Sequence, residues 1–229
     1  MDKPADTPIE LPFSAKYDRK HAEQYYSKHS DGLARRLSNW RDLQLARKAL
    51  AIAGEPTLVL DLPCGAGRFW PVLAEHPGRV IIAADNSADM LEVARTTQPP
   101  EIVARVRTMQ TSAFAIDLPA ESVDSIFCMR LLHHIGDADN RLAMLREFHR
   151  VTRDSVIVSL WVDGNYMAFK RKRLEARRRA AGRKSYQNRF VLEAPMVEKE
   201  FEDAGFRITG KLDFLPLHSM WRVYVLNKH

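Results

Sequence analysis

Short apolar segments alternate with helical segments along most of this chain, and that alternation constrains the fold more than any other feature. Val, Ile and Leu dominate the apolar segments, as is typical of strands buried on both faces of a parallel sheet. Predicted strands occupy residues 57–62, 79–85, 105–111, 122–129, 155–162, 207–215 and 221–227. Helices are predicted over residues 17–52, 71–75, 88–96, 140–151 and 195–206. Because strand–helix–strand units form right-handed crossovers between parallel strands, the pattern predicts an α/β fold.

The last two predicted strands have no helix between them. A short connection joins neighbouring strands in antiparallel orientation, so the sheet is expected to end in a hairpin. Residues 105–111 alternate between apolar and polar side chains, which places them near a sheet edge. Together these features predict a Rossmann-like, seven-stranded, mostly parallel sheet with a C-terminal antiparallel hairpin and helices on both faces.

Two regions are predicted along the chain. Residues 1–52 are expected to form an N-terminal helical lid or extension, because apolar side chains recur there at helical spacing. Residues 53–229 are expected to form the main domain, with a basic helical insert at about 165–190. The first region could cover a site, or it could simply pack on the sheet edge. The apolar side chains that recur at helical spacing include Leu33, Leu37, Trp40 and Leu43. The aromatic and cationic groups of the possible lid are Tyr17, Tyr25, Tyr26, Trp40 and Arg41.

Positive charge is concentrated in one segment. The chain has 35 Lys and Arg against 29 Asp and Glu, yet nine of these cations and a single acid, Glu175, lie within residues 170–184. This segment is expected to contact an anionic partner, which could be a small molecule, a membrane surface or a phosphorylated glycolipid. Nucleic acid ranks lower, because only Phe169 and Tyr186 flank the segment as stacking groups. A solvated helix without a partner is the alternative.

Several classes of protein are disfavoured by the remaining composition. No apolar run approaches the ~20 residues of a membrane-spanning helix, and the first residues lack the pattern of a secretory signal. Cys64 and Cys128 cannot make a disulfide framework, and no metal site is predicted around them. We therefore expect a cytoplasmic protein, with peripheral contact to a membrane surface as an option.

The motif VLDLPCGAGRF at residues 59–69 combines a strand end, a glycine-containing loop and a helix start. Gly65 and Gly67 allow a tight turn and a ligand against the backbone, and Asp85 ends the next strand, where it can accept ribose hydroxyls. The dinucleotide-binding motif has a third glycine at the position that Trp70 occupies in this chain. Asp61 also disfavours a pyrophosphate, because a carboxylate repels phosphate groups. A nucleoside with a cationic group fits these residues better.

The chain resembles the class I S-adenosylmethionine-dependent methyltransferases, in particular the small-molecule type found in ubiquinone and menaquinone biosynthesis. The resemblance is carried by DLPCGAGRF, AADNSADML, LPAESVDSIFCMRLLHHI, EDAGF and the final antiparallel strand. It implies S-adenosylmethionine as cofactor and methyl transfer as activity. Three positions depart from the family pattern: Pro63 replaces the first loop glycine, Ser112 replaces an adenine-contacting acid, and Arg130 replaces a small or amide residue.

The resemblance also implies roles for individual residues in cofactor binding. The methionine end would lie against the first loop, the ribose against the second strand end, and the adenine between the following helix and the third strand. The implied contacts are Asp61, Pro63, Gly65 and Gly67 for the methionine end, Asp85 and Asn86 for the ribose, Met90, Ser112, Ala113 and Phe114 for the adenine, and Met129 at the fourth strand end.

The acceptor is expected over the end of the fourth strand, near residues 129–134. His133 and His134 are the candidate bases, with His134 preferred, although either could instead pack beneath the loop. Arg130 could orient an anionic acceptor or pair with a nearby carboxylate. The segment CMRLL lacks the Asn/Asp-Pro-Pro-aromatic loop of amide and amine methyltransferases.

The predicted function is therefore methyl transfer to oxygen or carbon of a small or lipid-linked, anionic acceptor. One alternative is an RNA methyltransferase that docks through the basic segment. Another is a cofactor-binding interaction module without catalysis.

Overall fold

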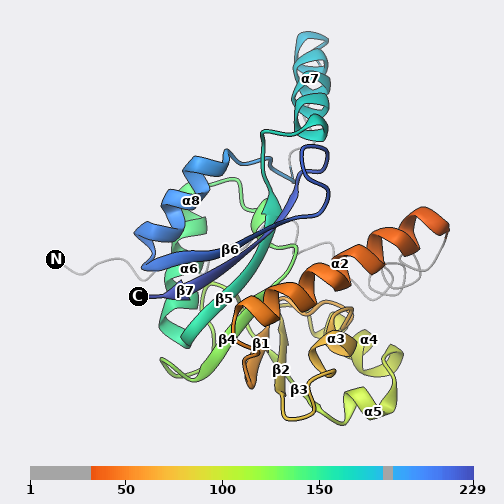
Figure 1. Ribbon diagram of the computed structural model, residues 1–229, viewed down its shortest axis with the longest axis vertical. Helices are drawn as coiled ribbons and strands as arrows, with labels where there is room; N and C mark the ends of the chain where they lie inside the picture. The colour runs from red at the N-terminus through yellow and green to blue at the C-terminus, as the bar shows by residue number, and fades with distance from the viewer. Residues whose placement is uncertain (1–31, 183–187) are drawn as a thin grey trace.

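Seven strands form a single sheet in the computed structural model, which describes residues 32–182 and 188–229 (Figure 1). The strand order is β3-β2-β1-β4-β5-β7-β6. The strands are β1 (Leu58–Asp61), β2 (Val80–Asp85), β3 (Val106–Gln110), β4 (Val123–Cys128), β5 (Thr152–Trp161), β6 (Phe206–Asp213) and β7 (Trp221–Lys228). All seven predicted strands are thus present, and β3 lies at an edge as expected.

Pairing directions confirm the predicted topology. β1 to β5 pair in parallel, whereas β7 runs antiparallel to both β5 and β6. The chain reverses its direction of strand addition between β1 and β4, which are neighbours in the sheet. In open α/β sheets a ligand site forms at the carboxyl ends of the strands at such a switch point.

Helices cover both faces of the sheet. They are α2 (Leu33–Ile52), α3 (Trp70–Leu73), α4 (Ala88–Thr97), α5 (Pro100–Val103), α6 (Ala138–Val151), α7 (Tyr166–Ala180) and α8 (Ala194–Asp203), with a 3₁₀ turn, η2, at Leu132–His134. Strand residues alternate between the two cores: Val59 and Phe127 face the α2 side, whereas Leu60 and Ile126 face the α6 and α8 side. The sequence did not predict α5 or η2, because both are single short turns.

The buried face of α2 coincides only in part with the predicted recurrence, since Leu43 packs against the core but other members do not. Leu37 and Trp40 are 65% and 54% exposed, and burial instead falls on the face of Leu45 and Ala49. Only the second half of the helix lies over the sheet, and the first half extends past it (Figure 1). The periodic pattern therefore predicted the helix but not which side it buries. The predicted lid residues Tyr17, Tyr25 and Tyr26 lie outside the described residues.

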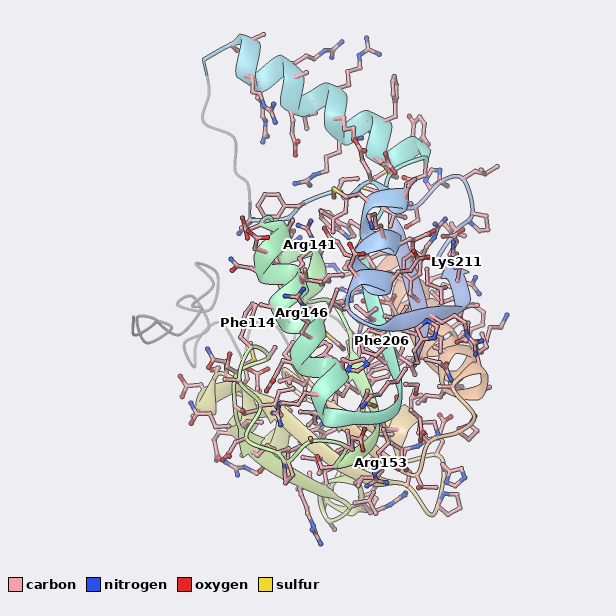
Figure 2. The ribbon with its side chains drawn as sticks, turned by 90° about the vertical axis from the view of Figure 1, so that its left-hand side faces the viewer. Phe114, Arg141, Arg146, Arg153, Phe206 and Lys211 are labelled. Carbon is pink, nitrogen blue, oxygen red and sulfur yellow. The ribbon has the colours of Figure 1, made fainter. Side chains whose placement is uncertain are left out.

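Helix α7 projects from the body of the molecule, with side chains extending from it on several sides (Figures 1 and 2). Ala168 is its one fully buried residue among those described. No helix in the described ranges is long and apolar enough to cross a membrane.

Candidate active site

A cavity of about 270 Å³ lies at the carboxyl ends of β1, β2 and β4, near the lower end of the size range of small-molecule sites. Most of the predicted site residues line it: Pro63, Gly65, Asp85, Asn86, Met90, Ser112, Ala113, Phe114, Met129, Arg130 and His134. Asp61, Gly67 and His133 do not. The remaining lining residues were not predicted as part of the site, and they are Leu62, Cys64, Ala66, Arg68, Phe69, Ser87, Thr111 and Leu131.

The loop after β1 presents open backbone to this cavity at one glycine. Gly65 has φ +54°, and a Cβ built there meets no atom within 4 Å. Gly67 also has a positive φ of +72°, but its Cβ would lie 2.8 Å from the Trp70 ring. Gly67 is therefore required for packing against Trp70, whereas Gly65 leaves room for a ligand.

Asp85 connects the two loops at the base of the cavity. Its Oδ2 accepts a hydrogen bond from the Gly65 amide at 3.0 Å, and its Oδ1 accepts one from the Ser87 amide at 2.9 Å. The residue is 8% exposed, and burial raises the pKa of its carboxyl despite these bonds. Ser87 also caps α4 as predicted, accepting a bond from the Met90 amide at 3.3 Å, which positions Met90 at the wall.

Asp61 lies behind the cavity wall rather than in its lining. Its carboxylate is buried, and neither oxygen accepts a hydrogen bond of normal geometry from a described residue. Burial, and then the charge of Asp85, raise the pKa of Asp61 well above its usual value, an effect that the Trp70 indole partly offsets. A buried carboxylate that lacks a strong donor favours a nearby cation and disfavours a phosphate.

The loop after β3 bonds largely to itself. The Phe114 amide donates to Ser112 Oγ at 3.2 Å, and Thr111 Oγ1 donates to the Ala115 carbonyl at 3.1 Å. The Phe114 amide, expected from the sequence to contact adenine, is thus already used. The ring of Phe114 and the backbone of Ala113 remain in the cavity lining.

Two arginines of the cavity lining share one carboxylate. Asp42 of α2 is 5% exposed and accepts hydrogen bonds from Arg68, at 2.6 Å, and from Arg130. Arg130 has φ +67°, its amide donates to Ser159 Oγ at 2.8 Å, and its guanidinium lies 4.8 Å from the centre of the Trp221 ring. Of the two roles considered for Arg130, pairing with a carboxylate is the one observed. Asp42 itself gave no sequence signal, because it lies 88 residues before Arg130.

The two candidate bases have different surroundings. His133 packs among the rings of His134, Trp161 and Trp221, and burial with the neighbouring His134 lowers its pKa to about 2. His134 lines the cavity, and its Nδ1 lies 2.5 Å from the Asn188 carbonyl oxygen. Burial lowers the pKa of His134, so its ring is neutral near pH 7. His133 therefore packs beneath the site, and only His134 reaches it.

The residues present fit a nucleoside that carries a positive charge. Gly65 offers space against bare backbone, Asp85 offers carboxylate oxygens to the cavity, and Asp61 adds a buried carboxyl group that a nearby cation would help to ionise. No group of three or more His, Cys, Asp or Glu that could hold a metal occurs in the described part of the chain. These observations agree with the cofactor expected from the sequence.

Comparisons with known proteins point to the same class. Residues 59–155 match the model of a methyltransferase domain family. The chain is 22% identical over 207 residues to the tRNA (carboxymethyluridine(34)-5-O)-methyltransferase ALKBH8 of Macaca fascicularis, covering 88% of this chain and 30% of that protein. It is 30% identical over 148 residues to the uncharacterized methyltransferase YcgJ of Bacillus subtilis, covering 63% of this chain and 51% of that protein. The chain thus spans about half or less of the length of these curated relatives.

Among solved structures, the magnesium protoporphyrin IX methyltransferase ChlM of Synechocystis with bound SAH superposes with a TM-score of 0.75 at 16% identity. The match covers 94% of this chain and 98% of ChlM, and a second ChlM structure contains bound SAM. The fold, the cavity at the switch point and the match over residues 59–155 agree, and so these residues belong to a methyltransferase domain whose fold is that of the class I, S-adenosylmethionine-dependent enzymes.

Proposed function

We propose that this chain transfers a methyl group from S-adenosylmethionine to an oxygen or carbon atom of a small or lipid-linked acceptor that carries negative charge. The observation that carries the proposal is the composition of one cavity. Its lining includes Asp85 and open backbone at Gly65 together with the guanidinium groups of Arg68 and Arg130. A cationic ligand and an anionic acceptor would thus each meet groups of opposite charge.

The cofactor would be held by residues at the base. Asp85 would accept the ribose hydroxyls, the loop at Gly65 and the charge of Asp61 would receive the methionine end, and Met90 would flank the adenine. When bound, S-adenosylmethionine supplies a methyl group on a positively charged sulfur. The contribution of the protein is then alignment of the two reactants and exclusion of water.

The acceptor would be oriented by these two arginines. Arg68 and Arg130 both line the cavity and both pair with Asp42. Guanidinium groups in the cavity lining favour a carboxylate, phenolate or phosphate group on the acceptor. Lys would be a poorer choice here, because the planar guanidinium can bind an anion through two parallel hydrogen bonds.

His134 would accept the proton that the acceptor loses. Because the Asn188 carbonyl can only accept, Nδ1 of the neutral ring carries the hydrogen and Nε2 carries the lone pair. When the bound cofactor supplies its methyl group, the proton lost by the acceptor would pass to Nε2. The hydrogen bond to Asn188 then fixes the ring that receives it.

A tRNA acceptor is the second candidate, and the similarity to ALKBH8 over 88% of this chain favours it. The basic helix α7 would then bind phosphates. The low identity of 22%, and the aliphatic side chains exposed near α7, favour the first candidate.

Transfer of a labelled methyl group distinguishes these functions. The chain is incubated with S-adenosylmethionine tritiated on the methyl group, and separately with a lipid extract, an aqueous metabolite extract and total tRNA. We expect label in a lipid or small-molecule product, and none with the Asp85→Asn variant. Label only in tRNA would establish the second candidate. Normal SAH binding without transfer to any fraction would indicate the non-catalytic module.

A further inference from the structure

Helix α7 is attached to the body through one face. Ala168 is 1% exposed, the Arg171 guanidinium lies 4.9 Å from the centre of the Trp161 ring, and Arg171 pairs with Glu175 at 3.1 Å. The opposite face is exposed along the described helix, and Tyr166 at its start stacks on His218. Tyr166, Lys170, Arg173 and Arg177 follow one another at helical spacing on that face, and all four are exposed.

Three cations on this open face are not neutralised by the part of the chain that the structure describes. Arg171 and Lys172 have acidic partners, at 3.1 Å and 3.4 Å. Lys170, Arg173 and Arg177 make no ion pair with any described residue. Single-sign charge on one face of a projecting helix is suited to an anionic partner.

Large apolar side chains are exposed among these cations. On α7, Phe169 and Leu174 are 64% and 50% exposed, and Tyr166 is 55% exposed. In the loop between β6 and β7, Leu215 is 49% and Leu217 is 84% exposed. Leu217 also has φ +61°, which a leucine rarely adopts. Exposure of several large apolar groups together marks an interaction site rather than an ordinary surface.

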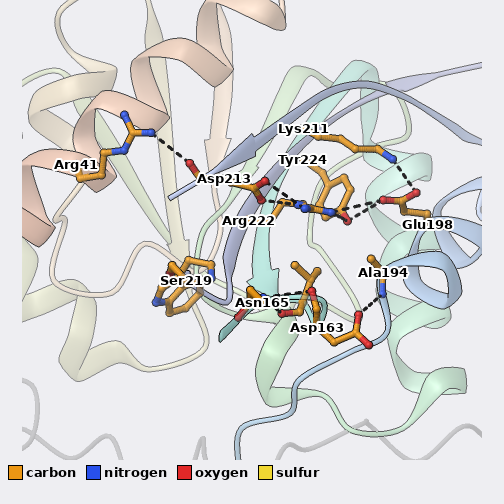
Figure 3. A network of polar contacts seen from close by, with 12 residues as sticks. Arg41, Asp163, Asn165, Ala194, Glu198, Lys211, Asp213, Ser219, Arg222 and Tyr224 are labelled. Carbon is orange, nitrogen blue, oxygen red and sulfur yellow. Dashed lines mark hydrogen bonds and ion pairs between the residues drawn. The ribbon is translucent and has the colours of Figure 1, made fainter. Parts of the chain in front are cut away.

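The β6–β7 loop is joined rigidly to the first turn of α7. The Tyr166 amide donates to the Leu217 carbonyl at 2.9 Å, the Met167 amide donates to the His218 carbonyl at 3.0 Å, and the Tyr166 ring stacks on His218. Arg41 of α2 donates to the Asp213 carbonyl at the base of the loop, which Figure 3 shows. The apolar residues of the loop are therefore presented next to the cations of α7.

We propose that this combined face is a docking surface for an anionic lipid membrane. The docking surface consists of Tyr166, Phe169, Lys170, Arg173, Leu174, Arg177, Leu215 and Leu217. Its cations would contact lipid phosphates, and its apolar side chains would enter the boundary between headgroups and acyl chains. Aliphatic groups such as Leu217 offer RNA neither stacking nor hydrogen bonds, which is why the membrane is favoured over nucleic acid.

The docking surface lies at the same edge of the sheet as the cavity. Helix α7 follows the carboxyl end of β5, and the loop precedes β7, which runs antiparallel to β5. Docking would therefore bring the cavity to the membrane surface. On the proposed function, it follows that the acceptor is lipid-linked and is taken from that surface.

Flotation of the full chain with lipid vesicles tests the docking surface. One set of vesicles is phosphatidylcholine, and the other is an equal mixture of phosphatidylcholine and phosphatidylglycerol. We expect binding to the mixed vesicles and much weaker binding to the neutral ones. The combined variant Lys170→Gln, Arg173→Gln, Arg177→Gln should bind the mixed vesicles on the order of a hundredfold more weakly. Equal binding of this variant and the unchanged chain would overturn the proposal.

A matched variant separates the surface from net charge. Lys48→Gln, Arg107→Gln, Arg207→Gln removes the same charge at exposed positions elsewhere, and it should retain vesicle binding. An equal loss in this variant would overturn the proposal.

The apolar contribution is tested by Phe169→Ser with Leu217→Asn, because Asn tolerates the positive φ at residue 217. This variant should lose about tenfold in binding at a salt concentration that weakens charge contacts. If it keeps vesicle binding, while tRNA binds the chain through the three α7 cations, the partner is nucleic acid and the membrane proposal is wrong.

Every variant is also titrated with SAH, which keeps this test separate from the test of the proposed function. A variant that binds SAH normally but no longer floats with vesicles has lost docking alone.

Discussion

The two ends of the cavity are built in different ways. On the proposed function, the cofactor end uses residues that lie close together in sequence, between β1 and the loop after β3, and its polar contacts are mainly to backbone amides, as at Asp85. The proposed acceptor end joins groups from distant segments: Asp42 of α2, Arg130 and the carbonyl of Asn188. The first end is therefore set by local chain geometry, and the second by how helices and loops pack.

This difference matches what each end must recognise. A cofactor shared by a whole class of enzymes can be bound by one local motif. An acceptor that differs between enzymes requires contacts that change without disturbing that motif, and contacts from separate segments allow it. Substitutions at the two ends should accordingly affect different measurements.

The largest effect is expected for Gly65→Val at the cofactor end. The new side chain would fill space that the cofactor needs, and SAH affinity measured by calorimetry should fall by at least about a hundredfold. Gly54→Val is the control, because Gly54 has φ +81°, equally open surroundings and no contact with the cavity. Similar losses of SAH binding in both variants would show that backbone strain, rather than occupied space, explains the effect.

Asp85→Asn should have the next largest effect. Hydrogen bonds to a charged group contribute about 1.5–3 kcal/mol, so SAH affinity should fall by about 10- to 100-fold. Asp89→Asn, at an exposed position in the first turn of α4, should leave the affinity unchanged. Unchanged affinity in Asp85→Asn would remove this carboxylate from the ribose site.

Asp42→Asn tests the acceptor end. The change leaves Arg68 and Arg130 close together without their shared negative charge, which should lower the free energy of unfolding by about 2 kcal/mol and the Tm by about 4–8 °C. SAH affinity should stay within about threefold, since the described partners of Asp42 are Arg68 and Arg130 and not the proposed ribose site at Asp85. A large loss of SAH binding would show that the two ends are not independent. Asp154→Asn, at an exposed position in β5, is the control for stability.

The smallest effect is expected for Asp61→Asn, and it depends on pH. Burial and Asp85 raise the pKa of Asp61 in the folded chain, so ionisation opposes folding as pH rises above the unfolded value. The variant lacks this penalty. The Tm of the variant minus the Tm of the unchanged chain should therefore be larger at about pH 8 than at about pH 5. It should also bind S-adenosylmethionine more weakly, because it lacks negative charge behind the loop. If the Tm of the variant and of the unchanged chain varied with pH in the same way, the Asp61 carboxylate would not be buried without a strong hydrogen-bond donor.

The sequence alone determined the order of strands and helices and most of the loop residues that line the cavity. Apolar periodicity reports which segments are buried strands, and glycines and acids at strand ends report a local loop geometry. Local pattern was therefore sufficient to place Gly65, Asp85 and Met90 in the cavity. The N-cap at Ser87 follows from the same kind of local signal.

Only the tertiary structure decided which distant groups meet. Periodicity predicted α2 but could not show that Leu45 is buried while Trp40 is exposed, since that depends on where the helix crosses the sheet. It likewise gave no sign of Asp42 beside Arg130, or of Leu217 beside the first turn of α7. These contacts arise from packing between segments far apart in the chain, and no local pattern records them.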